Sequence, residues 1–181
     1  MKKVVLLGDS IRLIGYGTKL PEITQGEFEI WQPDDNSRFV QYILRQIFDY
    51  SSEIDEAEIV HFNSGEWDIC RLYGDGTFTT PEYYVSQLER IVDILQKKGK
   101  KVVFATTTPV KEANPYNFNE DIEHFNKIAV EALTKKGVVI NDLYSVVMED
   151  LENNIREDNL HLSEVGIIKC AEATKKVLQS L

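Results

Sequence analysis

The sequence has few of the residues that stabilise small secreted domains or mark membrane proteins. Its 181 residues include two cysteines and five prolines, so it contains no disulfide framework. No stretch approaches the roughly 18 apolar residues of a membrane span. The apolar run behind the N-terminal lysines is too short for a signal-peptide core. We therefore expect a cytoplasmic protein that contacts no membrane.

Positive charge and metal-binding spacings are scarce as well. The chain carries 20 basic against 30 acidic residues, a net charge of −10. Because nucleic acids attract a basic surface, we expect no nucleic-acid partner. The histidines, His61, His124 and His161, are dispersed, and no His-x-His or Cys-x-x-Cys pair occurs. We expect neither a metal nor another cofactor.

Short apolar runs alternate with longer stretches of helical periodicity. This pattern predicts one domain over residues 1–181: an α/β fold in which helices cover both faces of a parallel sheet, giving three doubly wound α/β/α layers. The five expected strands are residues 2–8, 27–33, 58–63, 100–107 and 137–142. The expected helices are residues 37–50, 81–98, 119–136, 144–151 and 163–181, the last capped by Ser163.

Chemically active side chains follow several of these strands. Ser10 comes directly after the first strand, Asn63 ends the third, and Asp158 and His161 precede the last helix. Parallel sheets bind ligands beyond the carboxyl ends of their strands, so these residues are expected to meet at one edge. A serine hydroxyl becomes a strong nucleophile when a histidine takes its proton and a carboxylate orients that histidine. We therefore interpret Ser10, His161 and Asp158 as a catalytic triad.

A tetrahedral intermediate also needs hydrogen-bond donors aimed at its oxyanion. The backbone N–H of Ser10 and the side-chain amide of Asn63 are the donors that the residues themselves suggest. Gly8 lets the chain turn sharply before Ser10. The sequence thus predicts an oxyanion hole beside the nucleophile.

The motif GDSI at residues 8–11, the asparagine after the third strand, and the segment DNLHLSEVG at residues 158–166 resemble the SGNH, or GDSL-type, hydrolases. Members of that family are esterases, lipases, thioesterases and carbohydrate deacetylases with a flavodoxin-like fold. The resemblance implies the same triad and three oxyanion donors: the N–H of Ser10, a backbone N–H after the second strand, matched here by Ser37, and Asn63. The chain departs from the family at two motifs, with Ser37 in place of glycine and Asn63-Ser64-Gly65-Glu66 in place of Gly-x-Asn-Asp.

Four further residues are weaker candidates for contacting the substrate: Asp9, Asn36, Arg38 and Trp67. Asp9 has the alternative role of capping the turn at Ser10. We expect a small polar ester as the substrate, such as an acetylated carbohydrate, which serine-dependent hydrolysis converts through an acyl-enzyme. Acyl transfer at the same site and a non-catalytic module that binds a small ligand stay open as alternatives. A homo-oligomer also stays open.

Overall fold

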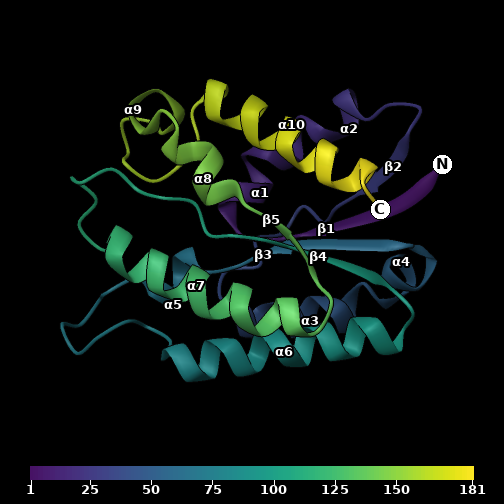
Figure 1. The fold of residues 1–181 in the computed structure, drawn as a ribbon, viewed down its shortest axis with the longest axis horizontal. Coiled ribbons are helices and arrows are strands. Elements are labelled where there is room, and N and C mark those ends of the chain that lie inside the picture. The colour runs from purple at the N-terminus through teal and green to yellow at the C-terminus, as the bar shows by residue number, and fades with distance from the viewer.

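A computed structural model describes residues 1–181, which are built around one parallel sheet (Figure 1). Its strand order is β2-β1-β3-β4-β5, the order of flavodoxin-like doubly wound folds. The strands are β1 Lys2–Leu7, β2 Phe28–Trp31, β3 Ile59–Asn63, β4 Lys101–Ala105 and β5 Val139–Asn141. All neighbours pair in parallel. The predicted fold class, including the number of strands, is confirmed.

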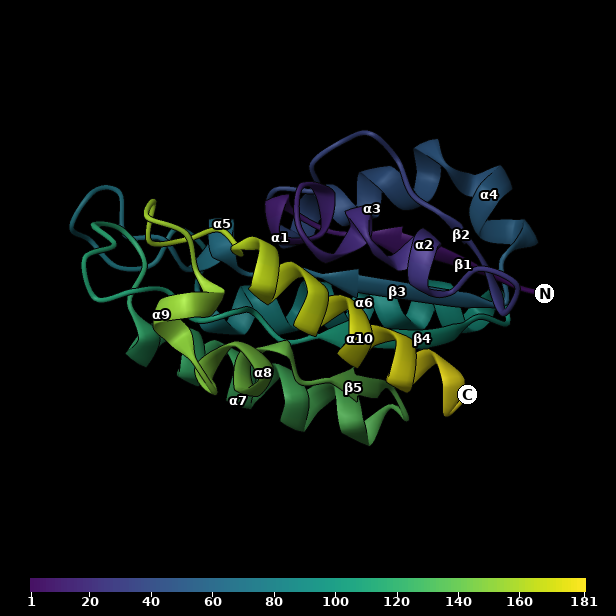
Figure 2. The ribbon, with the colours of Figure 1, turned by 90° about the horizontal axis from the view of Figure 1, so that it is seen from above.

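Helices cover both faces of the sheet, and the views in Figures 1 and 2 show the three layers. One face carries α3 Val40–Asp49, α4 Ser51–Glu56, α5 Glu66–Ile69, α6 Pro81–Lys97 and α7 Asn119–Lys135. The other carries α1 Ser10–Leu13, the 3₁₀ turn η1 Tyr16–Thr18, α2 Leu20–Ile23, α8 Leu143–Met148, α9 Leu151–Asn154 and α10 Glu164–Gln179. None of the helices combines the length with the hydropathy that a membrane span requires.

Burial on both faces explains why the strands are continuously apolar. Along β1, Val5 and Leu7 pack into the cluster formed with α3, α6 and α7. Val4 and Leu6 point the opposite way, into a cluster that includes residues of α2 and α10. Alternate side chains of a strand face opposite sides, so one short run supplies two cores. Because all five strands run parallel, their carboxyl ends and the loops that follow them lie at one edge of the sheet.

Two expected helices differ from those observed. The helix predicted from residue 37 begins at Val40, because Arg38 has φ +48° and Phe39 is extended. The helix predicted over residues 144–151 is replaced by α8 and α9. The cap on the last helix is confirmed, since the Ser163 hydroxyl accepts from the Gly166 N–H. The short elements missing from the prediction are α1, η1, α2, α4 and α5, each too brief to show a helical period.

Gly8 directly follows β1, at a place where Asn63 and Arg12 leave no room for a side chain. A Cβ at this position would lie 2.0 Å from Oδ1 of Asn63 and 2.9 Å from Cβ of Arg12. The absence of a side chain therefore lets the Asn63 carboxamide pack directly against the turn that leads to Ser10.

We predict that Gly8→Ala lowers the free energy of unfolding by about 1–3 kcal/mol, the usual cost of overpacking a core. The loss should be smaller in an Asn63→Ala background, because that change removes the nearest clashing atom. Urea unfolding of the wild type, both single variants and the double variant measures this coupling. Strictly additive losses would show that Asn63 is not what excludes a side chain at position 8.

Candidate active site

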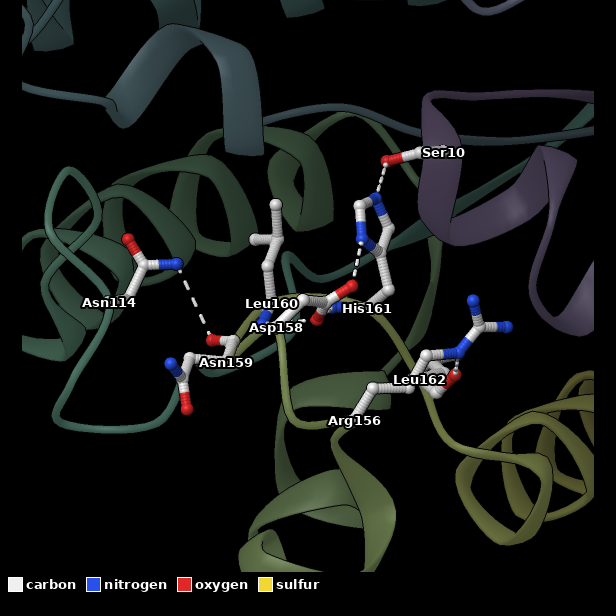
Figure 3. A network of polar contacts seen from close by, with 8 residues as sticks. All are labelled: Ser10, Asn114, Arg156, Asp158, Asn159, Leu160, His161 and Leu162. Carbon is white, nitrogen blue, oxygen red and sulfur yellow. Dashed lines mark hydrogen bonds and ion pairs between the residues drawn. The ribbon is translucent and has the colours of Figure 1, made fainter.

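Ser10, His161 and Asp158 form one connected line of hydrogen bonds (Figure 3). His161 Nε2 lies 2.9 Å from the Ser10 hydroxyl oxygen, and His161 Nδ1 lies 2.8 Å from Oδ2 of Asp158. A carboxylate only accepts hydrogen bonds, so the proton of a neutral His161 belongs on Nδ1. Nε2 is then free to accept from the Ser10 hydroxyl. The structure thus brings together three residues that the sequence separates by as much as 151 positions.

Asp158 is held in its ionised form by its partners. Partial burial acts to raise its pKa, but the N–H groups of His161 and Leu160 and the His161 ring outweigh burial and leave the pKa below its ordinary value. Both N–H groups donate to Oδ1, at 2.9 and 3.0 Å, while Oδ2 receives the imidazole. Asp158 therefore stays a carboxylate at neutral pH and fixes the orientation of the His161 ring.

The loop that carries Asp158 and His161 is closed by backbone contacts. Ile155 and Leu162 form an antiparallel bridge across it. The Arg156 N–H donates to the His161 carbonyl at 2.8 Å, and the Arg156 side chain donates to the Leu162 carbonyl at 2.7 Å. Asn159 takes φ +65° at the tip, a conformation that asparagine tolerates better than most residues. The loop therefore presents Asp158 and His161 in one fixed arrangement.

A cavity of about 310 Å³ opens beside this triad. Ten residues line it: Ser10, Asn36, Glu66, Trp67, Cys70, Leu72, Tyr116, Asn117, Leu160 and His161. Trp67 and Tyr116 are 43% and 54% exposed, so their rings lie open to solvent at this place. The cavity combines the Ser10 hydroxyl, exposed aromatic rings and amide side chains, a mixture suited to a small polar ligand.

Glu66 is a buried carboxyl in this lining that the sequence analysis did not select. Its Oε2 accepts from the Asn117 amide at 2.9 Å, and its Oε1 lies 3.2 Å from the Thr108 hydroxyl. Burial raises the pKa of Glu66 well above its ordinary range. The departure from the family's Gly-x-Asn-Asp motif was the available signal for Glu66. Nothing in the sequence placed Asn117 or Tyr116, which reach the cavity from the long loop after β4.

Two of the expected oxyanion donors are engaged elsewhere. The N–H of Ser37 donates to the Gly8 carbonyl at 3.0 Å, and Ser37 is fully buried. The Asn63 amide donates to Oδ1 of Asp9 at 2.8 Å, and its carbonyl oxygen accepts from the Tyr16 hydroxyl at 2.9 Å. Neither residue lines the cavity. The structure does not bring the expected donors of Ser37 and Asn63 to the cavity, because the Ser37 N–H and one N–H of the Asn63 amide have acceptors inside the protein.

The remaining expected donor, the Ser10 N–H, has no acceptor within the chain. Of the weaker substrate-contact candidates, Asn36 and Trp67 line the cavity. Asp9 is fully buried and caps α1 through the Ile11 N–H, so the capping interpretation is correct and the substrate contact is wrong. Arg38 stacks its guanidinium over the Tyr42 ring and is not part of the cavity lining.

No protein-family model matches the chain, and no curated protein matches its sequence. Solved structures match almost its entire length. The acetyl xylan esterase AlAXEase superposes with a TM-score of 0.80 at 18% identity, covering 97% of this chain and 99% of that one. A lipase/acylhydrolase from Enterococcus faecalis gives 0.78 at 19%, covering 99% and 97%. A GDSL-like lipase from Bacteroides thetaiotaomicron gives 0.75 at 17%, covering 99% and 89%.

The chain has the fold of these esterases and acylhydrolases. This is the fold that the resemblance to SGNH hydrolases implied. At these identities the likeness establishes the fold, and the activity depends on the residues of the site.

In this esterase-type fold, a buried cation ties the turn at Ser10 to the loop after β2. The Arg12 guanidinium is fully buried and donates to the backbone carbonyls of Gly8 at 3.1 Å, Pro33 at 2.8 Å and Asp35 at 2.5 Å. These carbonyls belong to two segments that flank the cavity. Arg12 therefore sets their separation.

We predict that Arg12→Met lowers the free energy of unfolding by at least about 2 kcal/mol, because it leaves the Pro33 and Asp35 carbonyls without a donor. Urea unfolding measures the loss. Arg45→Met is the matched control. Arg45 is exposed, pairs with Asp49 and lies 5.8 Å from the centroid of the exposed Phe48 ring, so its loss should stay within about 0.5 kcal/mol. Equal losses in both variants would contradict the role given to Arg12.

Proposed function

We propose that this protein is a serine hydrolase of carboxylic esters that works through an acyl-enzyme. The observation that carries this proposal is the unbroken line from Ser10 through His161 to Asp158 beside an open cavity. A solvent-accessible serine bound to the acceptor nitrogen of an oriented histidine is the arrangement of an activated nucleophile. The fold shared with solved esterases supports the same activity.

The geometry supports a two-stage reaction. Ser10 Oγ attacks the ester carbonyl carbon while its proton passes to Nε2 of His161, and the Nδ1–H bond to Asp158 stabilises the imidazolium. His161 then gives this proton to the leaving alcohol as the carbon–oxygen bond of the ester breaks. A water molecule repeats the attack on the acyl-enzyme, with His161 again taking and returning the proton, and releases the acid.

The cavity favours a small acyl group on a polar alcohol, and we propose an acetylated carbohydrate as the substrate. A volume of about 310 Å³ suits a short acyl chain and one sugar-sized group. Trp67 and Tyr116 offer aromatic faces on which a sugar ring packs. One matching structure is an acetyl xylan esterase, which agrees with this substrate class. A cytoplasmic location stays a prediction.

We predict that purified wild-type protein releases acetate from acetylated xylo-oligosaccharides and that Ser10→Ala abolishes this release while remaining folded.

A fluorophosphonate probe should label Ser10 in the wild type, and the label should be lost in His161→Ala. Mass spectrometry maps the adduct, and circular dichroism checks the fold. Adding a sugar alcohol separates hydrolysis from acyl transfer, since a transferase would divert acetate onto it. Turnover retained by Ser10→Ala would overturn the proposal.

We also predict that Asp158→Asn lowers kcat by about 10²–10⁴-fold, because an amide in place of the carboxylate favours the wrong tautomer of His161. Circular dichroism and urea unfolding should detect little change, since Asp158 lies in an exposed loop. Asp150→Asn, at an exposed position in a nearby turn, is the control and should retain wild-type kcat. A wild-type rate in Asp158→Asn would remove Asp158 from the mechanism.

A further inference from the structure

The proposed reaction needs a hydrogen-bond donor beside the Ser10 N–H, and neither the Ser37 N–H nor the Asn63 amide reaches the cavity. When a serine attacks an ester, the carbonyl oxygen acquires a full negative charge, and serine hydrolases stabilise it with more than one donor. The Ser10 N–H is available, but Ser37 and Asn63 are bound to groups of the protein. The other polar groups that line the cavity are therefore the candidates for a further donor.

Asn36 meets this requirement. It lies in the loop between β2 and α3, is half-buried, and lines the cavity together with Ser10 and His161. Its Oδ1 accepts from the Arg38 N–H at 2.7 Å and so forms an Asx turn. Because an N–H donates to the oxygen of a carboxamide, this contact assigns the second terminal atom of the Asn36 side chain as Nδ2. Nδ2 has no acceptor anywhere in the chain. It is thus a free amide donor in the wall of the cavity.

The loop holds this donor rigidly. Arg38, the residue that closes the Asx turn, takes φ +48°, a left-handed conformation that persists in residues other than glycine only where the surroundings impose it. The Asp35 carbonyl is bound by Arg12, and the Asp35 side chain accepts from the Tyr42 hydroxyl and the Gln46 amide. Because Arg12 also binds the Gly8 carbonyl, Asn36 and Ser10 are positioned by the same buried cation. A donor fixed before the reaction stabilises developing charge without reorganisation.

We propose that the Asn36 side-chain amide and the Ser10 backbone N–H form the oxyanion hole, so that Asn36 replaces the donors at Ser37 and Asn63; this inference rests on the proposed esterase function. As Ser10 Oγ bonds to the ester carbon, the carbonyl π electrons move onto oxygen, which accepts hydrogen bonds from Asn36 Nδ2 and Ser10 N. The Ser10 proton moves to His161. When the intermediate collapses, the carbonyl reforms, the alcohol leaves with the His161 proton, and the oxygen is neutral again.

Two substitutions at Asn36 separate the donor from the turn. Asn36→Asp keeps an oxygen that accepts from the Arg38 N–H, and aspartate is as good as asparagine in an Asx turn. It replaces the free amide with a carboxylate oxygen that repels the oxyanion. Asn36→Ser removes the amide donor without adding charge and leaves only a shorter hydroxyl at this position. A loss shared by both variants therefore cannot come from a charge effect on His161.

The experiment measures kcat and KM for 4-nitrophenyl acetate in the wild type, Asn36→Asp, Asn36→Ser and Ser10→Ala, with urea midpoints to confirm folding. We expect kcat to fall by about 10²–10³-fold in both Asn36 variants while KM changes only a few-fold, as when other hydrolases lose one oxyanion donor. If Asn36→Asp unfolds, the Asn36→Ser result alone decides.

The outcomes distinguish the two proposals. Folded Asn36 variants that keep kcat within about fivefold of the wild type, while Ser10→Ala is inactive, would overturn the role of Asn36 and leave the esterase function standing. Turnover that Ser10→Ala retains would overturn both proposals. A loss in Asn36→Asp with full activity in Asn36→Ser would also overturn the donor role, because it would trace the effect to the added charge.

Discussion

The Arg12 guanidinium links the two segments on which the candidate site is built. It is completely buried and bound to carbonyls from the end of β1 and from the loop after β2. Burial lowers its pKa, and the nearby Asp9, Asp35 and Tyr16 act in the opposite direction. A buried guanidinium is tolerated only where its donors find acceptors, so both segments must adopt the conformations that supply them. Ser10 and Asn36 lie on those two segments.

A second buried network explains why Asn63 is unavailable to the substrate. Asn141 donates to the Thr174 hydroxyl and contacts Nε2 of His61, whose ring packs edge-on against Tyr16. The Tyr16 hydroxyl then donates to Asn63, which donates to Asp9. Burial lowers the pKa of His61 to about 3, so its ring is neutral at physiological pH. Turning the Asn63 amide toward the cavity would leave buried groups unpaired, which costs more than one new hydrogen bond returns.

These two networks fix the turn after β1 from two sides. The network through Asn63 and Asp9 holds the turn from inside the protein, where the capped N-terminus of α1 begins. The Arg12 contacts hold it against the neighbouring loop. The Ser10 hydroxyl is left to His161 alone, and the Ser10 N–H stays free. Within these two networks, Oδ2 of Asp9 and Nε of Arg12 are the buried side-chain atoms that have no partner.

The fold and the meeting of Ser10, His161 and Asp158 could be predicted from local patterns in the sequence. Apolar strands such as residues 2–7 and helical periodicity determined the layers, and the position of Ser10, Asp158 and His161 after successive elements predicted that they would meet. This worked because a parallel sheet brings its strand ends to one edge whatever the loops do. Which amide side chain lies at the cavity beside Ser10 was decided by the tertiary structure. Asn63 is held inside the protein by Tyr16 and Asp9, which packing across the sheet brings to it. Asn36 lines the cavity, and its Oδ1 is held by the N–H of Arg38, a residue in the left-handed conformation. No periodicity in the sequence reveals either arrangement.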